Sequence, residues 1–245
     1  LYNALGQYPK AESLYLEAVN VFKKVYGDSS NEYALAINNL AGLYFTMGNY
    51  KQTELFYSQA REIWGKGAGK ESPDYATACS NLGALYQQLG EYSKAEALYK
   101  ESKILQERIT GKDDPDYATS CNNLGDLYRE QENFFKAEPL YLEAMEIRGR
   151  VLGDSHPLYV QSCLNTGLLY NDMGQYAKAE HLLVEAKKGY TKIATATPDY
   201  ANSCSQLAAL YRSLGNYSKA EELYMESREV FGSVLGKDHS DYAQV

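Results

Sequence analysis

The chain has 245 residues and a formal net charge of −8, from 24 basic and 32 acidic side chains. This acidic balance argues against a surface for nucleic acid or for an anionic membrane, because both need a basic stripe. No apolar run approaches the roughly 20 residues that a membrane span requires.

A block of the form Tyr-x-Lys-Ala-Glu recurs along the whole chain. Its copies begin at Tyr8, Tyr50, Tyr92, Phe134, Tyr176 and Tyr217, and the copy at Tyr50 is the weakest. Successive copies are 42 residues apart four times, and the last two are 41 residues apart. A fixed period of this size indicates a stacked array, in which each repeat buries its apolar face against its neighbours. The period also favours binding over catalysis as the default function.

The period divides the chain into predicted repeats. They are a partial repeat at 1–26, repeats at 33–68, 75–110, 117–152, 159–193 and 200–235, and the start of a further repeat at 241–245. We expect these repeats to form one elongated all-α domain over residues 1–245. Because Leu1 and Tyr2 match the late part of a repeat, we also expect the chain to be part of a longer protein.

The stretch 73–110 shows the pattern within one repeat. Asp74 is the predicted N-cap of a first helix, and Gly90 is predicted to end that helix in a left-handed conformation. A second helix follows, and Gly111 is predicted to terminate it. Each repeat is therefore predicted to be a helical hairpin, in which the small Gly83 lets a neighbouring helix approach. The helical stripes of the two helices are Tyr75, Cys79, Leu82, Gly83 and Tyr86, then Tyr92, Ala95, Leu98, Tyr99 and Ser102.

Four departures from the pattern stand out, and three of them have predicted consequences. Glu132 replaces the turn glycine of one repeat. The glycine-rich tract 65–69 is expected to end its helix early and to leave a mobile loop. The repeat that is one residue shorter loses that residue between 189 and 198, which should alter one connection. Pro139 is predicted to lie in the first turn of a second helix, where the missing N–H matters little.

The four cysteines Cys79, Cys121, Cys163 and Cys204 occupy one equivalent position in successive repeats. Equivalent residues of stacked hairpins lie about 10 Å apart, which is too far for a disulfide bridge. No Cys-x-x-Cys or Cys/His cluster suggests a metal site. We therefore predict a ladder of small buried thiols, and a reducing, cytoplasmic compartment.

No catalytic or cofactor site can be assembled from the sequence. The segment 65–72 fails the Walker A pattern at two positions and does not follow a predicted strand. The histidines His156, His181 and His239 lie too far apart in the repeats to share a metal or a catalytic pair, and all three are predicted at the surface. The glutamates of the repeated blocks are separated by whole repeats, and we expect them to be solvated. These are Glu12, Glu96, Glu138, Glu180 and Glu221.

Three segments carry a resemblance to a known family: Asn122–Tyr128, Lys136–Tyr141 and Leu152–Pro157. With them the chain resembles tetratricopeptide repeat proteins, of the long-repeat kind found in kinesin light chains and in bacterial arrays attached to caspase-like CHAT proteases. The resemblance covers essentially the whole chain. It implies an α-solenoid of antiparallel hairpins that forms a right-handed superhelix. The usual period of the family is about 34 residues, so we expect about two extra helical turns in each repeat.

In this family the side of the first helix that faces away from the stack lines a concave groove. Side-chain amides recur on that side, and each carries both a donor and an acceptor. They could bind the backbone of an extended peptide without demanding a particular sequence. Alternatively, they could bond between neighbouring repeats and fix the superhelix, and recurrence follows from either role. The amides are those of Asn38, Asn39, Asn81, Asn122, Asn123 and Asn165, with Gln206 in the last copy.

Side-chain specificity is expected from groove positions that vary between repeats. Leu164 with Leu168 is predicted to offer an apolar pocket, and Arg129 and Arg212 could each meet an acidic ligand residue. Asp126, Glu130 and Asp172 would locally offset Arg129. No repeated Lys or Arg is placed to clamp a C-terminal carboxylate. The candidate binding residues are Asn38, Asn39, Phe45, Asn81, Gln87, Asn122, Asn123, Asp126, Arg129, Leu164, Asn165, Leu168, Asn171 and Arg212.

Three functions remain open at this point. The leading hypothesis is a non-catalytic scaffold that binds a protein or an extended peptide in the groove, without a cofactor, a metal, nucleic acid or a membrane. The second is the regulatory arm of a larger enzyme such as a CHAT protease. The third is a structural array whose end repeats stack on another copy. A kinesin light chain would also need a heptad coiled coil, which these residues lack.

Overall fold

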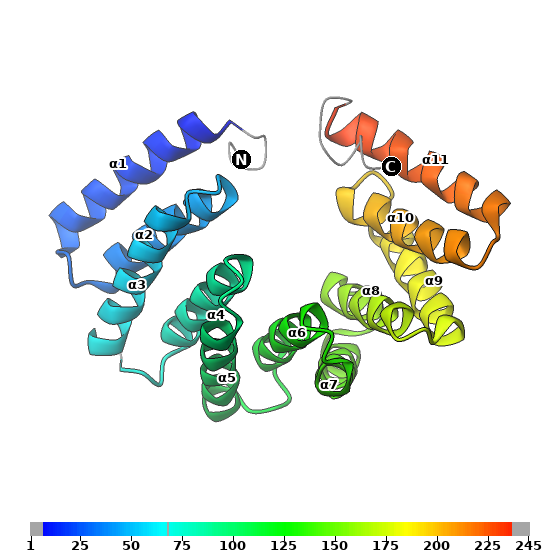
Figure 1. Ribbon diagram of the computed structural model, residues 1–245. Helices are drawn as coiled ribbons and strands as arrows, with labels where there is room; N and C mark the ends of the chain where they lie inside the picture. Colours follow the sequence, from blue (N-terminus) through cyan, green and yellow to red (C-terminus); the bar gives the residue numbers. More distant parts are fainter. Residues whose placement is uncertain (1–6, 68, 237–245) are drawn as a thin grey trace. The chain divides into compact units, whose positions relative to one another are not determined.

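The computed structural model describes residues 7–67 and 69–236, and all regular secondary structure in these residues is helical (Figure 1). The helices pair as antiparallel hairpins, with α1 preceding the first hairpin. The predicted class, an all-α array of stacked helical hairpins, is therefore confirmed. The helices are α1 (Tyr8–Tyr26), α2 (Asn31–Thr46), α3 (Tyr50–Gly67), α4 (Pro73–Gln88), α5 (Tyr92–Ile109), α6 (Pro115–Glu130), α7 (Phe134–Leu152), α8 (Pro157–Asp172), α9 (Tyr176–Ile193), α10 (Pro198–Ser213) and α11 (Tyr217–Val234).

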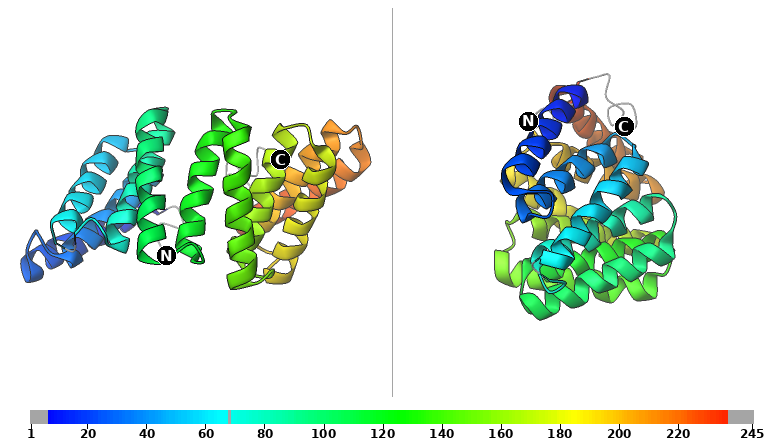
Figure 2. Two further views of the ribbon diagram at one scale, coloured as in Figure 1. Left: turned by 90° about the horizontal axis from the view of Figure 1, so that it is seen from below. Right: turned by 90° about the vertical axis from the view of Figure 1, so that its left-hand side faces the viewer.

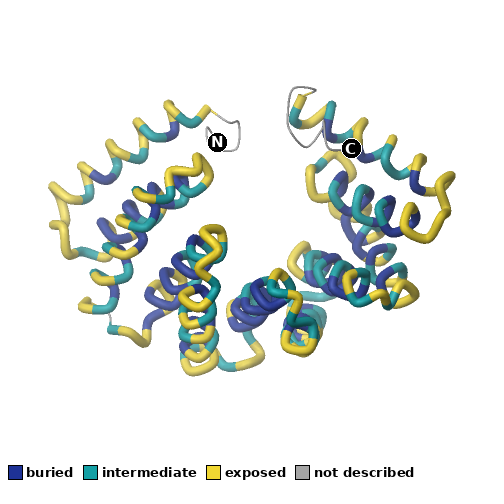
Figure 3. The backbone as a smooth tube through the Cα atoms, in the orientation of Figure 1, coloured by how far each residue is buried: buried dark blue, intermediate teal, exposed yellow. Residues whose placement is uncertain are grey.

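The chain divides into two compact units. The first unit, residues 1–112, contains α1–α5, and the second unit, residues 113–245, contains α6–α11. Within each unit the first helices of the hairpins form one layer and the second helices form another (Figures 1 and 2). Burial is concentrated where the helices of a unit face one another, and the turns are exposed (Figure 3).

Each first helix begins after a residue whose side chain caps its first turn. In α4 the hydroxyl of Ser72 accepts a hydrogen bond from the backbone N–H of Tyr75 at 3.3 Å. The predicted N-cap Asp74 was therefore wrong by two residues. Pro73 already has helical geometry, so Asp74 lies inside the first turn, where its charge favours the helix dipole.

The turn inside each hairpin follows the predicted glycine pattern. Gly90 has a φ of 73°, and the next N–H, that of Glu91, bonds to the Tyr86 carbonyl at 2.8 Å. This closure satisfies carbonyls at the end of α4 that have no partner inside the helix. In the hairpin of α6 and α7, Glu132 takes the same left-handed conformation with a φ of 57°. A side chain disfavours that conformation, because its Cβ approaches the following carbonyl.

The structural consequences predicted for two of the departures were wrong. Helix α3 does not end early, since it continues to Gly67 and is as long as α5 and α9. Its Gly65 packs against the ring of Tyr75, at a position where a Cβ would come within 3.1 Å of that ring. Pro139 is the sixth residue of α7, beyond the first turn, so the helix loses one internal hydrogen bond.

The shorter repeat does alter one connection, as predicted. The residue after α9 is Ala194, whose backbone is extended, whereas a left-handed glycine lies one or two residues after the other described second helices that precede a further hairpin. Residue 68 of the predicted loop, the predicted start of a repeat at 241–245 and His239 lie outside the described residues.

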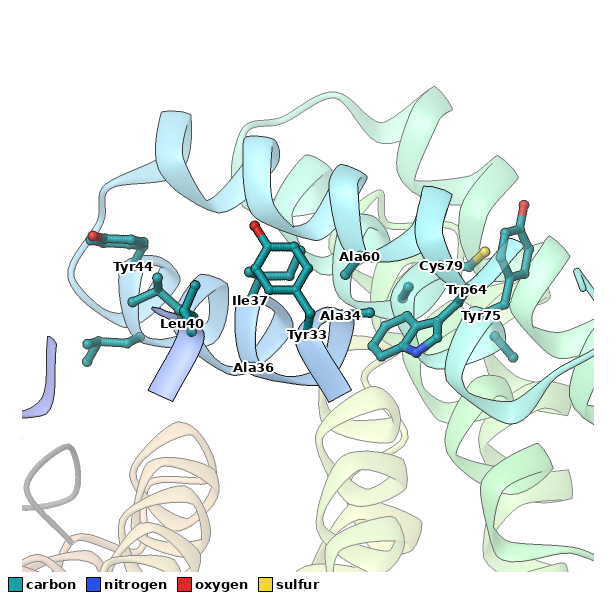
Figure 4. Close-up of a cluster of buried hydrophobic side chains, with 14 of the residues drawn as sticks. Tyr33, Ala34, Ala36, Ile37, Leu40, Tyr44, Ala60, Trp64, Tyr75 and Cys79 are labelled. Carbon is teal, nitrogen blue, oxygen red and sulfur yellow. The ribbon is translucent and has the colours of Figure 1, made fainter. Parts of the chain in front are cut away.

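The core of each unit is built from the predicted stripes. In the first unit, Ile37 and Leu40 of α2 pack with Ala60 and Trp64 of α3 and with Cys79 of α4 (Figure 4). The four cysteines are buried free thiols, as the sequence predicts.

Close approach at a small residue also occurs as expected. A Cβ added to Gly83 would lie 2.7 Å from the ring of Tyr99, which comes from the partner helix of the same hairpin.

Candidate binding surface on the first helices

A tyrosine–glutamate hydrogen bond joins neighbouring repeats inside each unit. The Tyr44 hydroxyl on α2 donates to Glu12 on α1 at 2.8 Å, and the Tyr211 hydroxyl on α10 donates to Glu180 on α9 at the same distance. The equivalent bonds are Tyr86 to Glu54 and Tyr170 to Glu138. The prediction that the glutamates of the repeated blocks are solvated was therefore wrong for Glu12, Glu138 and Glu180.

The lysine of the same block lies over a tyrosine ring of its own hairpin. Lys178 Nζ is 4.6 Å from the ring centroid of Tyr170, and Lys219 Nζ is 4.7 Å from that of Tyr211. A cation over a ring face is attracted by the negative face of the π system. Tyr86, Tyr170 and Tyr211 are thus each held by a lysine of their own repeat and a glutamate of the previous one, whereas Gln52 replaces the lysine in the repeat of Tyr44.

A second polar cluster surrounds the cysteines. Around Cys79, Arg61 donates from Nε to the thiol at 3.3 Å, and from Nη2 to Glu101 at 2.8 Å. Tyr75 donates to the other oxygen of Glu101 at 3.0 Å. Burial raises the pKa of the Cys79 thiol to about 11, so it stays protonated and inert at neutral pH. All four cysteines are buried free thiols, and Cys79 is part of the packing between α3, α4 and α5.

The recurring asparagines bond to one another between repeats. Asn81 donates to Asn38 at 3.0 Å in the first unit, and Asn165 donates to Asn122 at 3.0 Å in the second. These amides therefore take part in the packing of neighbouring first helices. The side chains of Asn39 and Asn123 show no such bond among the described residues, and both are at least partly exposed. Their side-chain donors and acceptors are therefore not used in bonds to other first helices within the described residues.

Asp126 and Asn122 belong to a polar chain in the second unit. Tyr141 donates to Asp126, and Asn122 Nδ2 donates to its other oxygen at 2.8 Å. Asn165 in turn accepts from Gln161 at 2.8 Å. Removal from water raises the pKa of Asp126 to about 6, although the Tyr141 bond and nearby arginines act in the opposite direction.

Arg148 is a buried cation that sequence reasoning missed. It is 3% exposed and donates to Ser162 on α8 at 2.7 Å and to Thr119 on α6 at 3.0 Å. Burial lowers its pKa. The equivalent residues in other repeats are Trp64, Gln106 and Tyr190, so the signal in the sequence was a charge at a position that is otherwise uncharged.

The variable positions differ in how accessible they are. Arg129 forms an ion pair with Asp172 of the next repeat at 2.6 Å, as its acidic neighbours suggested. Arg212 is exposed, while Asn171 and Leu168 are partly exposed. Leu164 is 2% exposed within the core, so the predicted pocket of Leu164 and Leu168 was wrong. In the first unit, Phe45 is partly exposed and packs against Tyr50, and Gln87 accepts a bond from Tyr99 at 3.0 Å.

Surface cavities occur on the terminal helices. One of about 430 Å³ lies on α1 beside Leu16 and Val21, and another of about 300 Å³ lies beside Arg212, Tyr217 and Met225. Across residues 7–67 and 69–236, no group of three or more His, Cys, Asp or Glu side chains could hold a metal ion. None of the described helices is long and apolar enough to cross a membrane.

The stacked hairpins and the joints between them define an α-solenoid. Sequence profiles described as tetratricopeptide repeat match residues 1–66, 33–103, 74–134 and 116–192, and a further one matches 201–241. The chain therefore belongs to the tetratricopeptide repeat family. Such repeats serve as protein-interaction scaffolds, and they generally bind other proteins or peptides.

Solved structures show the same fold. The crystal structure of BtubC (BKLC) from P. vanneervenii gives a TM-score of 0.75 at 22% identity, covering 95% of this chain and 92% of that chain. Nearly identical repeats from a putative kinesin light chain of Podosopora anserina give 0.67 at 21% identity, covering 83% of this chain and 97% of that chain. The predicted likeness to kinesin light chain repeats is thus confirmed for the fold. No curated protein matches the chain, and an association with a CHAT protease stays a prediction.

Proposed function

We propose that the chain is a non-catalytic scaffold that binds an extended peptide or protein segment on the exposed surface of its first helices. One observation carries the proposal: the position directly after the recurring Leu-Tyr pair of the first helices changes its chemistry from repeat to repeat. The position holds Phe45 and Gln87 in the first unit, and Arg129, Asn171 and Arg212 in the second. None of these five side chains is buried. A variable, accessible position on a repeated framework suits the reading of different ligand side chains.

The amides supply a complementary, sequence-tolerant contact. Asn39 and Asn123 lie six residues before the variable positions of their helices, about a third of a turn away around the helix axis, and neither is buried. Because their side-chain groups are not used in bonds between described residues, they can bond the backbone of a ligand. Asn81 and Asn165 hold neighbouring first helices together, and in this way they set the spacing between the helices that would contact the ligand.

The test uses this division between free and bonded amides. The purified chain captures partners from a lysate, mass spectrometry identifies them, and the affinity of the best partner is then measured. The first variant carries three substitutions, Asn39→Ala, Asn123→Ala and Arg212→Ala. We expect it to bind the partner more weakly while its melting temperature stays unchanged. Asn81→Ala/Asn165→Ala is the structural control, and it should lower the melting temperature. Full affinity in the first variant would contradict the proposal.

A second candidate function, end-to-end association, is favoured by the exposed apolar side chains of the terminal helices. On α1, Leu16 and Val21 are 39% and 50% exposed, and on α11 Met225 is 63% exposed. Contiguous apolar surface of this kind often marks a protein contact. Light scattering over a range of concentrations tests it, since a strictly monomeric chain would exclude it.

A further inference from the structure

The exposed side of α7 carries an apolar stripe that the other second helices lack. Phe135 is 89% exposed and Leu142 is 37% exposed, and Pro139 is exposed between them. Their spacing of four and then three residues places them on one side of the helix, along about 10 Å of its length. In every other described second helix, at least one of the three equivalent positions is polar.

The stripe is not needed to hold α7 in place. The opposite side of the helix packs through Ala137, Tyr141 and Ala144, which are almost fully buried. Pro139 even weakens the helix, because it removes the backbone donor that would meet the Phe135 carbonyl. That carbonyl is left at the edge of the stripe with no donor from the helix.

Carboxylates stand at both ends of the stripe. Glu146 follows Leu142 by four residues and lies on the same side of α7, about 17 Å along the helix from Phe135. Glu132 lies in the turn before α7, in the left-handed conformation that glycine occupies in the hairpins with Gly48, Gly174 and Gly215. Both carboxylates are exposed. A disfavoured backbone conformation that presents a charge beside exposed apolar residues points to a role in binding.

We propose that Phe135, Pro139 and Leu142, with Glu132 and Glu146 at the two ends, dock an amphipathic helix of a partner protein that has an apolar centre and basic residues on both sides. The charges favour this occupant over a second copy of the chain. A second copy would bring a net charge of −8, with its own glutamates, to the acidic ends of the stripe. A partner helix of about 12 residues spans the roughly 17 Å along α7 between Phe135 and Glu146.

This surface belongs to a second helix and is separate from the first-helix surface of the proposed function. Either of the two proposals can therefore fail in its test while the other holds. Binding at the stripe should survive Asn39→Ala/Asn123→Ala, and binding at the first helices should survive substitutions in the stripe.

The experiment measures binding of a synthetic helical peptide to the whole 245-residue chain. The probe has about 18 residues, a leucine and phenylalanine stripe at helical spacing, lysines at both ends and a fluorescent label. Fluorescence anisotropy at low salt gives its affinity. The test variant is Phe135→Ser/Leu142→Ser, because serine occupies these positions in α5 (Ser93) and in α3 (Ser58), so the fold should tolerate it.

We expect the double serine variant to bind the probe at least about tenfold more weakly, since two exposed apolar side chains are lost. Leu55→Ser is the matched control, because Leu55 is 57% exposed on α3 at the position of Pro139, and it should leave the affinity unchanged. Glu132→Gln/Glu146→Gln should weaken binding about threefold or more and reduce its dependence on salt. A probe with glutamates in place of the lysines should bind worse than the original.

Three results would overturn the proposal. The first is a probe that does not bind at low salt, and the second is one that binds Phe135→Ser/Leu142→Ser as well as the wild type while circular dichroism shows both folded. The third is self-association, seen by light scattering, that the double serine variant abolishes. The stripe would then be a contact between copies of the chain.

Discussion

The hydroxyl of Tyr211 donates a hydrogen bond of 2.8 Å to Glu180, a residue of the preceding repeat. Burial, followed by this bond, raises the pKa of Tyr211 to about 12. Three further bonds of the same kind join repeats inside the two units, from Tyr44, Tyr86 and Tyr170. The joints therefore depend on tyrosine hydroxyls that stay protonated.

Replacing Tyr211 by Phe should destabilise the second unit by about 1–2 kcal/mol, the usual range for a hydrogen bond to a charged group that is partly accessible. Urea unfolding followed by circular dichroism measures the change. Tyr217→Phe is the control, because the Tyr217 side chain is 70% exposed and should lose little. Equal losses in both variants would show that the bond to Glu180 adds nothing.

The chain should lose stability in alkali as the tyrosine hydroxyls of these joints ionise. The folded-state pKa is raised to about 12 for Tyr44, Tyr86, Tyr170 and Tyr211, whereas an unfolded tyrosine titrates near about 10. The stabilisation is therefore complete below pH 10 and is lost as the pH rises toward 12. Absorbance of tyrosinate and helical circular dichroism should change together, and ionisation of these tyrosines without loss of helix would contradict the prediction.

A reversal of residue size in one repeat gives a third prediction. A Cβ on Gly189 would lie 2.4 Å from Val160. The equivalent pairs in other repeats place the small residue on the first helix, as in Ala76 with Leu105. Gly189→Ala alone should therefore cost about 1–3 kcal/mol from overpacking. The double change Val160→Ala/Gly189→Ile should restore most of that stability, and a double-mutant cycle in urea checks the coupling. Additive losses would mean that the two positions do not share space.

The turn before α7 offers a stabilising substitution. Glu132 has a φ of 57°, and glycine adopts that region without the cost of a Cβ. Glu132→Gly should raise the free energy of unfolding by about 1 kcal/mol, and Gly174→Glu should lower it by a similar amount. Thermal unfolding of the two variants gives the comparison. A loss of stability in Glu132→Gly would indicate that the Glu132 side chain makes a favourable contact.

Asp126 should make the second unit more stable in mild acid, relative to a variant that cannot titrate there. Its folded pKa of about 6 lies above the ordinary value of 3.8. A raised pKa gives stabilisation that is complete below about pH 4 and lost as the pH rises through 6. The wild type should therefore lose up to about 2 kcal/mol relative to Asp126→Asn between pH 4 and pH 7. Urea unfolding of both proteins at the two pH values measures this difference. Because the other carboxylates are present in both proteins, their contribution to the pH dependence cancels. A difference independent of pH would mean that Asp126 is ionised throughout.

The repeat period predicted the hairpins because core residues recur with it. Cys79 and Gly83 were identified as buried, close-packed positions from recurrence alone. The role of Glu180 was not predicted, because its donor Tyr211 lies 31 residues away on the next first helix. Spacing within one helix identifies neighbours on that helix only.

The candidate site was predicted less well, for a geometric reason. Successive residues of a helix are about 100° apart, so a small rotation decides whether a position at the edge of a face is buried. Leu164 and Asn122 occupy such an edge position, and both are buried although they were predicted in the groove. Asn123 and Asn165, one residue later in their helices, are partly exposed. Their receptor role stays a prediction.

The interchangeable tyrosine–glutamate joints have a consequence for the length of the chain. In the second unit, Glu138 meets Tyr170, and Glu180 meets Tyr211. Excision of residues 157–197, which span α8 and α9, would bring Glu138 to face Tyr211 through the same pair of residue types. It would also remove Val160 and Gly189 together. The tyrosine–glutamate joint would therefore be preserved when a whole hairpin is removed or inserted, so the length of the array is a modular property.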